Sequence, residues 1–422
     1  MRRFAVPSVL LLLGSLAQVL SPAGLRAEVP AEIIGRVERM PLPPSPHWAT
    51  ASDPLLERSA IIDLDNDRLL GVVDGGWGFT IPVFSRDATE IYVPETHYSR
   101  RSRGVRTDVV TFYDLETLTP QAEVEIPPKR ASNTLPMANA ALSDDGRLLA
   151  VFNMNPSTSL SIVDVVERRF VGEIGTPGCS LVYAAGPRRF AMLCSDGALL
   201  LIQLDESGRL ESRRRSQPFF DPQVDPVTEK AVRWGDTWLF VSFDGFVHPV
   251  DVSGSEPVFG PRWSLFTKPE RREGWRIGGS RHLAVHQSSG RFYSLVHRGE
   301  QDSHKDGGKT VFVYDLATQE RVQRIDLYSV GLTYLGIPVG FGENWIWPFN
   351  RLYDGLLGLA GDALGVEEIS VTQDERPLLV TAANYAGVVA IYDAQSGDFL
   401  GRVTTGNMTV LGLQTPFAAG GR

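Results

Sequence analysis

The chain has 422 residues, of which 43% are hydrophobic and 22% charged, and it carries a formal net charge of −9. This negative charge argues against a nucleic acid as the partner, because proteins that bind nucleic acids present an excess of basic side chains. The 41 glycines and 28 prolines indicate many turns and argue against a helical protein.

The N-terminus has the three parts of a secretory signal peptide. Arg2 and Arg3 form a basic start, an apolar run continues to about Leu20, and small residues near Ala27 offer a cleavage site. A membrane anchor is the alternative, but the run is short and interrupted by proline and glycine. We therefore predict export to the periplasm with residues 1–27 removed. No later segment reaches about 18 uninterrupted apolar residues, so we expect a soluble mature chain.

One unit recurs along the rest of the chain: an apolar strand, an aspartate, a short polar turn and a second strand. Aspartate suits the entry to the turn, because its carboxylate can accept a hydrogen bond from the backbone N–H two residues further on. The seven turn-entry positions are Asp63, Asp114, Asp164, Leu204, Asp251, Asp315 and Asp393. They lie 40 to 78 residues apart, and a period of about 40 to 50 residues is typical of propeller blades.

The repeat predicts an all-β fold: a seven-bladed β-propeller with four-stranded antiparallel blades over residues 28–422. The first copy, at Ser59, lacks two preceding strands of its own, whereas the C-terminal stretch GRVTTGNMTVLGLQTP has a strand to spare. We expect the N- and C-terminal segments to complete one shared blade, which closes the ring and leaves no long exposed edge. A helical period is suggested only between Phe266 and Gly274.

A cluster of arginines precedes the second copy. Arg100, Arg101, Arg103 and Arg106 lie in YSRRSRGVRTDVV. The simpler interpretation is a solvated loop between strands, because charge runs are usually exposed. Alternatively, the loop forms an interface for an acidic partner, since guanidinium groups bind carboxylates through paired hydrogen bonds.

The two cysteines of the chain, Cys179 and Cys194, are equidistant from a turn at Gly186-Pro187. Antiparallel pairing around this turn places them opposite each other, within the range that a disulfide needs. A metal site would need more ligands, and a redox pair would have the C-x-x-C context. Because the predicted export leads to an oxidising compartment, we favour a structural disulfide.

Few other patterns point to chemistry. His282 and His286 share a face if they lie on a strand and would make a ligand pair, but no third ligand is evident, so packing is the favoured interpretation. We interpret His304, in a glycine-rich loop, as a surface residue. The chain has none of the nucleophile-elbow, zinc-protease or phosphate-loop motifs.

Residues 328–365 interrupt the repeat and account for its longest spacing. This insertion is apolar and aromatic, and Trp345, Trp347 and Phe349 lie near its centre. So long an apolar loop must either fold back on the ring or be buried against another chain. We favour the second alternative, because aromatic residues are enriched in protein interfaces.

Several long stretches in the same order resemble one family. They are GVVDGGWGFTIPV, RGVRTDVVTFYDLETLTPQAEVEIPPKR, MNPSTSLSIVDV, GWRIGGSRHLAVHQSSGRFYSLVH and HKDGGKTVFVYDLATQERV. They resemble the heavy subunit of methylamine and aromatic amine dehydrogenases, the tryptophan tryptophylquinone enzymes. The likeness covers roughly residues 60–327 and 366–400, and the insertion departs from it.

The resemblance implies a seven-bladed propeller with a disulfide that matches Cys179 and Cys194. It also implies a periplasmic heterotetramer of two heavy and two light subunits. The small, cysteine-rich light subunit would carry the quinone and the catalytic base, so no catalytic, cofactor-binding or metal-binding residue is expected in this chain. The complex would oxidise a primary amine to an aldehyde and ammonia, and pass electrons to a blue-copper protein such as amicyanin or azurin.

Two other functions stay open. One is an exported propeller that only binds proteins and has no quinone partner. The other is a self-sufficient enzyme, such as a lactonase or a pyrroloquinoline quinone dehydrogenase, although the tryptophan that docks the blades of the latter is missing from every copy. The amine also stays open, because the stretch HWATASDPLLERSAIID lacks the phenylalanine that narrows the substrate channel in the methylamine type.

Overall fold

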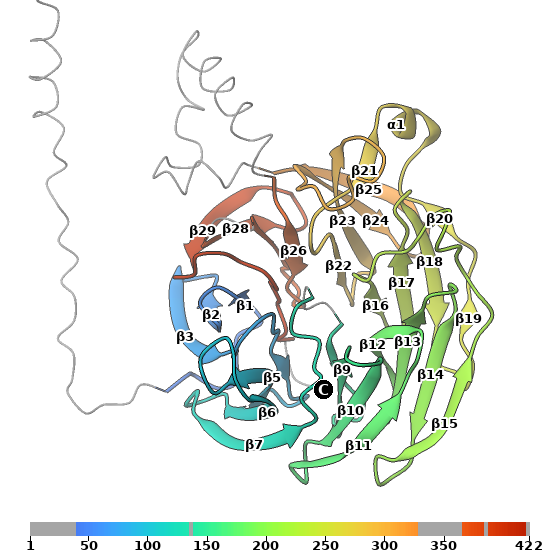
Figure 1. Ribbon diagram of the computed structural model, residues 1–422. Helices are drawn as coiled ribbons and strands as arrows, with labels where there is room; N and C mark the ends of the chain where they lie inside the picture. Colours follow the sequence, from blue (N-terminus) through green and yellow to red (C-terminus); the bar gives the residue numbers. More distant parts are fainter. Residues whose placement is uncertain (1–38, 135–137, 328–364, 384–386, 419–422) are drawn as a thin grey trace, which may run out of the picture. The chain divides into compact units, whose positions relative to one another are not determined.

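The computed structural model describes residues 39–134, 138–327, 365–383 and 387–418. The predicted signal peptide, residues 1–27, and the insertion up to residue 364 lie outside this part of the chain. Within the described residues, the strands form seven antiparallel sheets around a central axis (Figure 1). The predicted seven-bladed propeller is therefore confirmed, and we number its blades in chain order.

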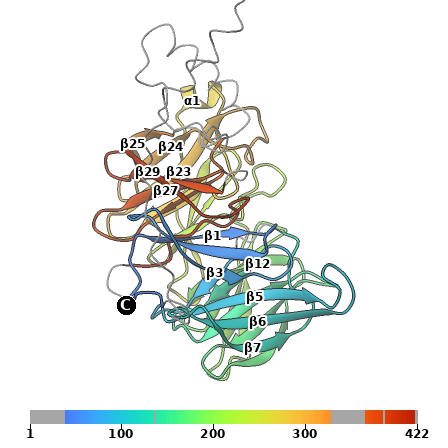
Figure 2. The ribbon, with the colours of Figure 1, turned by 90° about the vertical axis from the view of Figure 1, so that its left-hand side faces the viewer.

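The first three blades follow one another from the start of the described chain, and Figure 2 shows β5, β6 and β7 of blade 2 side by side. Blade 1 contains β1 (Trp48–Asp53), β2 (Arg58–Asp63) and β3 (Arg68–Asp74); blade 2 contains β4 (Val83–Phe84), β5 (Glu90–Tyr98), β6 (Arg106–Asp114) and β7 (Pro120–Ile126); blade 3 contains β8 (Ala140–Leu142), β9 (Leu148–Asn153), β10 (Ser159–Asp164) and β11 (Arg169–Gly175).

The remaining four blades complete the ring, and blades 5 and 6 each have a fifth short strand. Blade 4 contains β12 (Cys179–Gly186), β13 (Arg189–Cys194), β14 (Leu199–Leu204) and β15 (Leu210–Arg215); blade 5 contains β16 (Val232–Trp234), β17 (Thr237–Val241), β18 (Phe246–Asp251), β19 (Val258–Phe259) and β20 (Trp263–Ser264); blade 6 contains β21 (Trp275–Ile277), β22 (Leu283–His286), β23 (Arg291–Arg298), β24 (Thr310–Asp315) and β25 (Glu320–Asp326); blade 7 contains β26 (Glu368–Val371), β27 (Leu378–Ala382), β28 (Val388–Asp393) and β29 (Phe399–Thr404).

The aspartate turns predicted from the repeat are confirmed. Asp315 Oδ1 accepts a hydrogen bond from the backbone N–H of Ala317 at 2.8 Å. Leu204 stands at the turn entry of the fourth copy, and there the next residue, Asp205, accepts from the N–H of Ser207 at 2.8 Å. A carboxylate accepts from an N–H two or three residues further on at Asp63, Asp114, Asp164, Asp251 and Asp393 as well.

The C-terminal segment completes blade 1, as predicted. The N–H of Thr50 in β1 donates to the carbonyl oxygen of Gln414 at 2.8 Å, and the N–H of Gln414 donates back to Thr50 at 2.9 Å. A further backbone bond joins Leu411 to Ser52 at 2.9 Å. The first copy was expected to lack two preceding strands, but it lacks only one. The segment WATASD forms the other, β1, and is buried throughout. Its alanines and serine are too small to be recognised as an apolar strand.

The hydrophobic core lies between the blades. The described residues form seven buried clusters, and each joins two neighbouring sheets around the ring. One cluster joins blade 7 to blade 1. It includes Val403 of blade 7, Ala60 of blade 1, and Val410 and Leu413 of the C-terminal segment. Burial of one large apolar side chain is worth about 1.5–3 kcal/mol. Since these side chains are buried between sheets, the packing of neighbouring blades against each other is the main stabilising contribution to each blade.

The helical period between Phe266 and Gly274 corresponds to a single short helix, α1 (Lys268–Arg272). Thr267 caps it, since its hydroxyl accepts from the N–H of Glu270 while the Glu270 carboxylate accepts from the N–H of Thr267. In the part of the chain that the structure describes, no helix has the length and apolar character to cross a membrane.

Candidate functional site

The two cysteines form the predicted disulfide. Cys179 in β12 and Cys194 in β13 are directly opposed in the antiparallel register, and their sulfur atoms are bonded at 2.01 Å. Both residues are buried in the cluster that joins blade 3 to blade 4. The disulfide is therefore a structural link within the β12–β13 hairpin.

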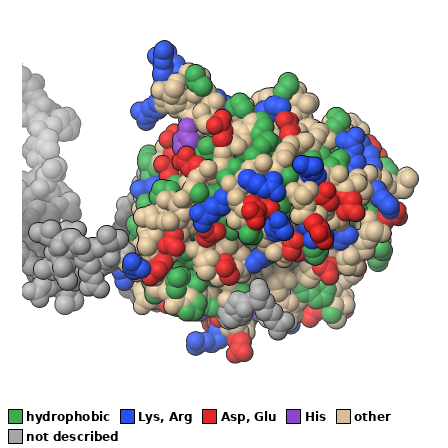
Figure 3. All heavy atoms as spheres, turned by 90° about the horizontal axis from the view of Figure 1, so that it is seen from below, with side chains coloured by type: hydrophobic (Ala, Val, Ile, Leu, Met, Phe, Trp, Pro, Cys, Tyr) green, Lys and Arg blue, Asp and Glu red, His purple; other side chains and the backbone are tan. Residues whose placement is uncertain are grey.

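The predicted arginine cluster separates into two parts. Arg100, Arg101 and Arg103 are exposed in the tight loop between β5 and β6. Arg106, at the start of β6, is half-buried, and its guanidinium donates to both carboxylate oxygens of Asp108 at 2.8 Å. Arg106 thus has an internal partner, and three arginines remain at the surface. The loop thus carries basic side chains close together, whereas acidic and basic side chains are interspersed on the face of the molecule shown in Figure 3.

The other predicted interface residues, Trp345, Trp347 and Phe349, lie outside the described part of the chain. The structure therefore gives no information about their surroundings.

The two histidines of blade 6 are both buried and have separate partners. His286 contacts the hydroxyl of Ser289 at 2.7 Å and the carbonyl oxygen of Asp374, in blade 7, at 2.9 Å. His282 instead faces the hydroxyl of Thr228, in blade 5, at 3.5 Å. Across residues 39–418, apart from the stretches not described, no group of three or more His, Cys, Asp or Glu is placed to hold a metal. Packing thus accounts for the pair.

His304 does not lie free at the surface. Its ring stacks on Phe243 in blade 5 at a centroid distance of 3.5 Å, and the residue is half-buried. His304 is therefore only partly at the surface, because its ring packs on the neighbouring blade.

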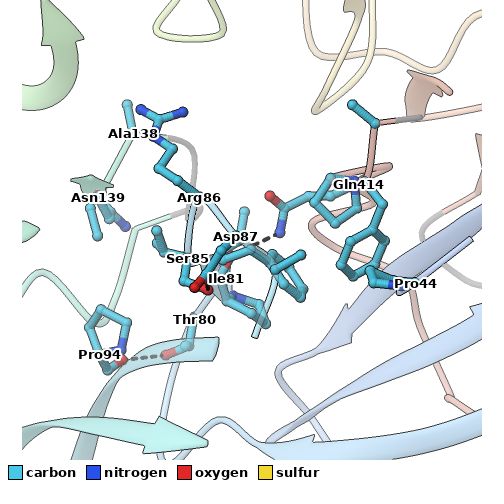
Figure 4. Close-up of a pocket in the computed structure, with 18 of the residues that line it drawn as sticks. Pro44, Thr80, Ile81, Ser85, Arg86, Asp87, Pro94, Ala138, Asn139 and Gln414 are labelled. Atoms are coloured by element: carbon cyan, nitrogen blue, oxygen red, sulfur yellow. Dashed lines mark hydrogen bonds between the residues drawn. The ribbon is translucent and has the colours of Figure 1, made fainter. Parts of the chain in front are cut away.

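Three cavities surround the ring axis, with volumes of about 820, 330 and 270 Å³. Arg281 and Gln414 line all three, and the innermost strands of the blades supply much of the remaining wall. We call these cavities together the axial channel. Figure 4 shows the largest of them, with Gln414 on one side and residues 80–87 on another.

Residues 79–83, at the end of the motif GVVDGGWGFTIPV, form part of the wall of the largest cavity, and the glycines before them shape the loop that leads into it. Gly76 and Gly78 have φ values of +61° and +90°, and a Cβ atom at Gly78 would lie 2.4 Å from the carbonyl oxygen of Ser132. Only glycine fits at this position. The guanidinium of Arg130 donates to the carbonyl oxygen of Phe79 at 3.0 Å and so fixes the loop from behind.

A buried polar network supports this wall. Asp108 accepts from the Arg106 guanidinium and from the backbone N–H of Arg130 at 2.8 Å. Burial lowers the pKa of Arg130 to about 10. The nearby buried carboxylate of Glu95 accepts from the hydroxyl of Thr111 at 2.6 Å, and burial raises the pKa of Glu95. These groups serve to position the loop, because their hydrogen bonds are directed at one another and at the backbone.

Two arginines of the channel wall share one carboxylate. Arg86 contacts Asp144 at 3.2 Å, and Arg233 contacts the same side chain at 2.7 Å. Arg233 also forms an ion pair with Asp236 at 2.9 Å. These guanidinium groups link blades 2 and 5 to the β8–β9 turn of blade 3.

Sequence reasoning did not identify the residues that shape the channel. Asp108 and Arg130 lie inside stretches that carry the family resemblance, yet nothing in their spacing marks them as partners. Arg281 directly precedes His282, and nothing in the sequence marks it as a residue of the channel. The glycines of DGGWG are the one usable signal, because closely spaced glycines mark a backbone with special requirements.

Comparison with known proteins identifies the chain's relatives. A sequence model described as methylamine dehydrogenase heavy chain matches residues 51–339. The methylamine dehydrogenase heavy chain of Methylorubrum extorquens is 28% identical over 276 residues, which cover 63% of this chain and 65% of that protein. The heavy chain of Paracoccus versutus is 26% identical over 345 residues, covering 81% of this chain and 71% of that one. The match thus spans slightly less than two thirds of the first relative.

Solved structures share the fold at low sequence identity. A functionally unknown protein from Desulfotomaculum acetoxidans superposes with a TM-score of 0.55 and 12% identity, covering 87% of this chain and 98% of its own. The dihydro-heme d1 dehydrogenase NirN superposes with a TM-score of 0.51 and 17% identity, covering 92% and 78%. These likenesses concern the propeller fold alone. The sequence match over residues 51–339 goes further, and it shows that the chain belongs to the methylamine dehydrogenase heavy chain family.

Proposed function

We propose that the chain is the heavy subunit of a periplasmic amine dehydrogenase that converts a primary amine to an aldehyde and ammonia. The observation that carries this proposal is the family match over residues 51–339. The relatives named as methylamine dehydrogenase heavy chains support it over most of the ring. The predicted signal peptide, residues 1–27, supports export to the periplasm.

In this proposal, tryptophan tryptophylquinone and the catalytic base belong to a small, cysteine-rich light subunit. Such a quinone is built from two tryptophan side chains. The proposal assigns no catalytic step to this chain. The role of the chain is to hold the light subunit, in a complex of two heavy and two light chains.

The exposed loop with Arg100, Arg101 and Arg103 supports a role in docking. Among the residues that the structure describes, no carboxylate forms a salt bridge with these three guanidinium groups, so they present donors to carboxylates of a partner. That partner would be the light subunit or the electron acceptor, a blue-copper protein such as amicyanin or azurin. The aromatic insertion at 328–365 is proposed as a second contact, with Trp345, Trp347 and Phe349 at its centre.

The test is purification of the full chain from its native periplasm under mild conditions. We expect a second, smaller subunit to co-purify, the complex to absorb visible light as a quinone does, and a primary amine to reduce a redox dye. A colourless single chain that is inactive with amines contradicts the proposal. Such a chain would favour a protein-binding propeller, while activity without a second subunit would favour a self-sufficient enzyme.

A matched pair of variants tests the docking loop. Replacing Arg100, Arg101 and Arg103 by glutamine should weaken recovery of the light subunit or slow electron transfer to the blue-copper protein. The control replaces three arginines of the outer strand β15, Arg213, Arg214 and Arg215, which are also exposed but already have partners within the chain. If both triple variants behave alike, the loop has no special role in docking.

A further inference from the structure

Arg281 has an unusual position in the ring. Its backbone is fixed between blades 6 and 7, because its N–H donates to the carbonyl oxygen of Glu367 and its own carbonyl oxygen accepts from Ile369, both at 2.9 Å. From this point the residue lines all three cavities of the axial channel. The guanidinium therefore stands where the cavities meet, near the axis of the propeller.

The other charged groups of the channel wall have partners. Arg86 and Arg233 share Asp144, and Arg130 donates to backbone carbonyls. Asp87 accepts from Ser85 and Thr89, and Glu229 lies 3.6 Å from the ammonium of Lys230. The wall thus contains four arginines and two acids, and both acids already have polar partners.

Arg281 differs from these groups. Within the described residues, no hydrogen bond or ion pair of its guanidinium is observed. The carboxylate whose charge acts on it is Glu368. However, Glu368 accepts from the backbone N–H groups of Gly412 and Leu413, at 2.8 and 2.5 Å, and from the hydroxyl of Ser280 at 3.1 Å. Its oxygens are occupied by neutral donors, so Arg281 keeps a full set of unused donors that face the channel.

A guanidinium withdrawn from bulk water and lacking a bound carboxylate is unfavourable, unless something in the channel compensates it. Burial accordingly lowers the pKa of Arg281. The largest cavity, about 820 Å³, has ample room for a small molecule. Planar guanidinium groups bind carboxylate and phosphate oxygens through two parallel hydrogen bonds.

We propose that the axial channel binds a small oxyanion, a carboxylate or phosphate group, through the guanidinium of Arg281. The site is independent of the proposed dehydrogenase activity, because it needs neither a light subunit nor an amine. Bound there, the anion neutralises the charge between blades 6 and 7 and the C-terminal segment that completes blade 1. It therefore acts as a ligand that stabilises the closed ring.

The experiment measures thermal unfolding of the full mature chain in a chloride buffer of constant ionic strength. Sodium acetate or sodium phosphate replaces part of the chloride. We expect a saturable rise in Tm of about 2 °C at ten times the Kd of at least one anion. A response to acetate alone identifies a carboxylate, and a response to phosphate alone identifies a phosphate.

Three variants make the result specific. Arg281→Met should abolish the rise, because it removes the paired donors that bind the anion. Arg281→Lys, which keeps the charge but not the paired donors, should raise the Kd at least tenfold. Arg209→Met, an exposed arginine of blade 4, should respond as the wild type does.

Three outcomes overturn the proposal. The first is a wild type that shows no saturable response to either anion up to about 50 mM, roughly where a weak site would fill. The second is an Arg281→Met variant that responds like the wild type. The third is an Arg281→Lys variant that binds the anion with the wild-type Kd, which would show that the paired donors do not hold it. If Arg281→Met does not fold, Arg281→Lys decides: an unchanged Kd contradicts the proposal.

Discussion

Two regions of the ring are closed in opposite ways. In blade 4, a disulfide joins Cys179 to Cys194, only 15 positions apart and already opposed in one hairpin. In blade 1, hydrogen bonds join Thr50 to Gln414, from the two ends of the described chain. The covalent link secures a local structure that the turn would form anyway. The closure on which the whole ring depends is non-covalent, and burial and one carboxylate stabilise it.

Deleting the C-terminal segment that completes blade 1 should have the largest effect on the stability of the ring. Deleting residues 410–422 removes three buried apolar side chains, Val410, Leu413 and Phe417, and the buried hydroxyl of Thr415. At about 1.5–3 kcal/mol for each apolar side chain, their loss is comparable to the whole stability of a domain. We expect an insoluble or protease-sensitive protein, measured by limited proteolysis and urea unfolding. Met408→Ala, an exposed change nearby, should match the wild type. A truncated chain with the wild-type urea midpoint would contradict the closure.

Removal of the Glu368 carboxylate should have the second largest effect on the stability of the ring. Glu368→Ala leaves the N–H groups of Gly412 and Leu413 buried without an acceptor, so we expect a loss of about 3–5 kcal/mol in urea unfolding. Glu368→Gln keeps one acceptor oxygen and should lose less. Glu375→Ala, at an exposed position of the same blade, should change stability by less than about 0.5 kcal/mol. Equal losses of stability in Glu368→Ala and Glu375→Ala would show that the Glu368 carboxylate does not stabilise the closure of the ring.

Opening the disulfide should have a smaller effect than losing the closure. Replacing Cys179 and Cys194 together by alanine frees a loop of 15 residues, which costs about 3 kcal/mol in the chain-entropy model. We expect the ring to keep its β-sheet circular dichroism and to unfold at lower urea concentration. A reducing agent should destabilise the wild type and leave the double variant unchanged. Complete unfolding of the double variant would reverse the ranking of the two closures.

The smallest effect concerns pH and Glu367, which precedes Glu368 at the same junction. Burial raises the pKa of Glu367 from 4.5 to about 7, and the neighbouring charges of Glu368 and Asp306 add to the rise, while Lys230 opposes it. The folded state therefore binds this proton more tightly than the unfolded state, and stability falls as pH rises from about 4.5 to 7.

The variant Glu367→Gln should make the stability of the ring depend less on pH within that window. The difference between pH 5 and pH 7.5 should shrink by on the order of 1 kcal/mol, measured by urea unfolding at each pH. Glu375→Gln serves as the control and should follow the wild-type profile. An unchanged profile for Glu367→Gln would show that another group titrates there.

Local chemistry explains how far the fold could be predicted. An aspartate that accepts from a backbone N–H two or three residues on can be recognised in the sequence, such as Asp315 before Ala317. Six such aspartates and the copy with Leu204 together give the number of blades. The strand WATASD carries no such signal, because after Trp48 alanine alternates with threonine and serine and no large apolar residue follows. It is a strand because β2 and the C-terminal segment flank it, and that information lies elsewhere in the chain.

The same distinction applies to the candidate site. The disulfide could be predicted, because both cysteines belong to one hairpin with a symmetric turn. Arg106 could not be separated from its exposed neighbours, since its partner Asp108 gives no sign in the sequence. Arg281 and Glu368 were missed for a stronger reason. Glu368 acquires its role from Leu413, 45 positions away, and Arg281 acquires its role from a channel that exists only once all blades are in place.

The shared blade also sets an order of events during synthesis. The side chain of Asn407 donates to the carbonyl oxygen of Ala51 across 356 positions. The strands of blades 2 to 7 follow one another in the chain, whereas blade 1 is completed only when almost the whole chain has been made. Until then, β1 presents an unpaired edge to other chains, which is a known route to aggregation. A chain that stops short of Gln414 would keep that edge open permanently.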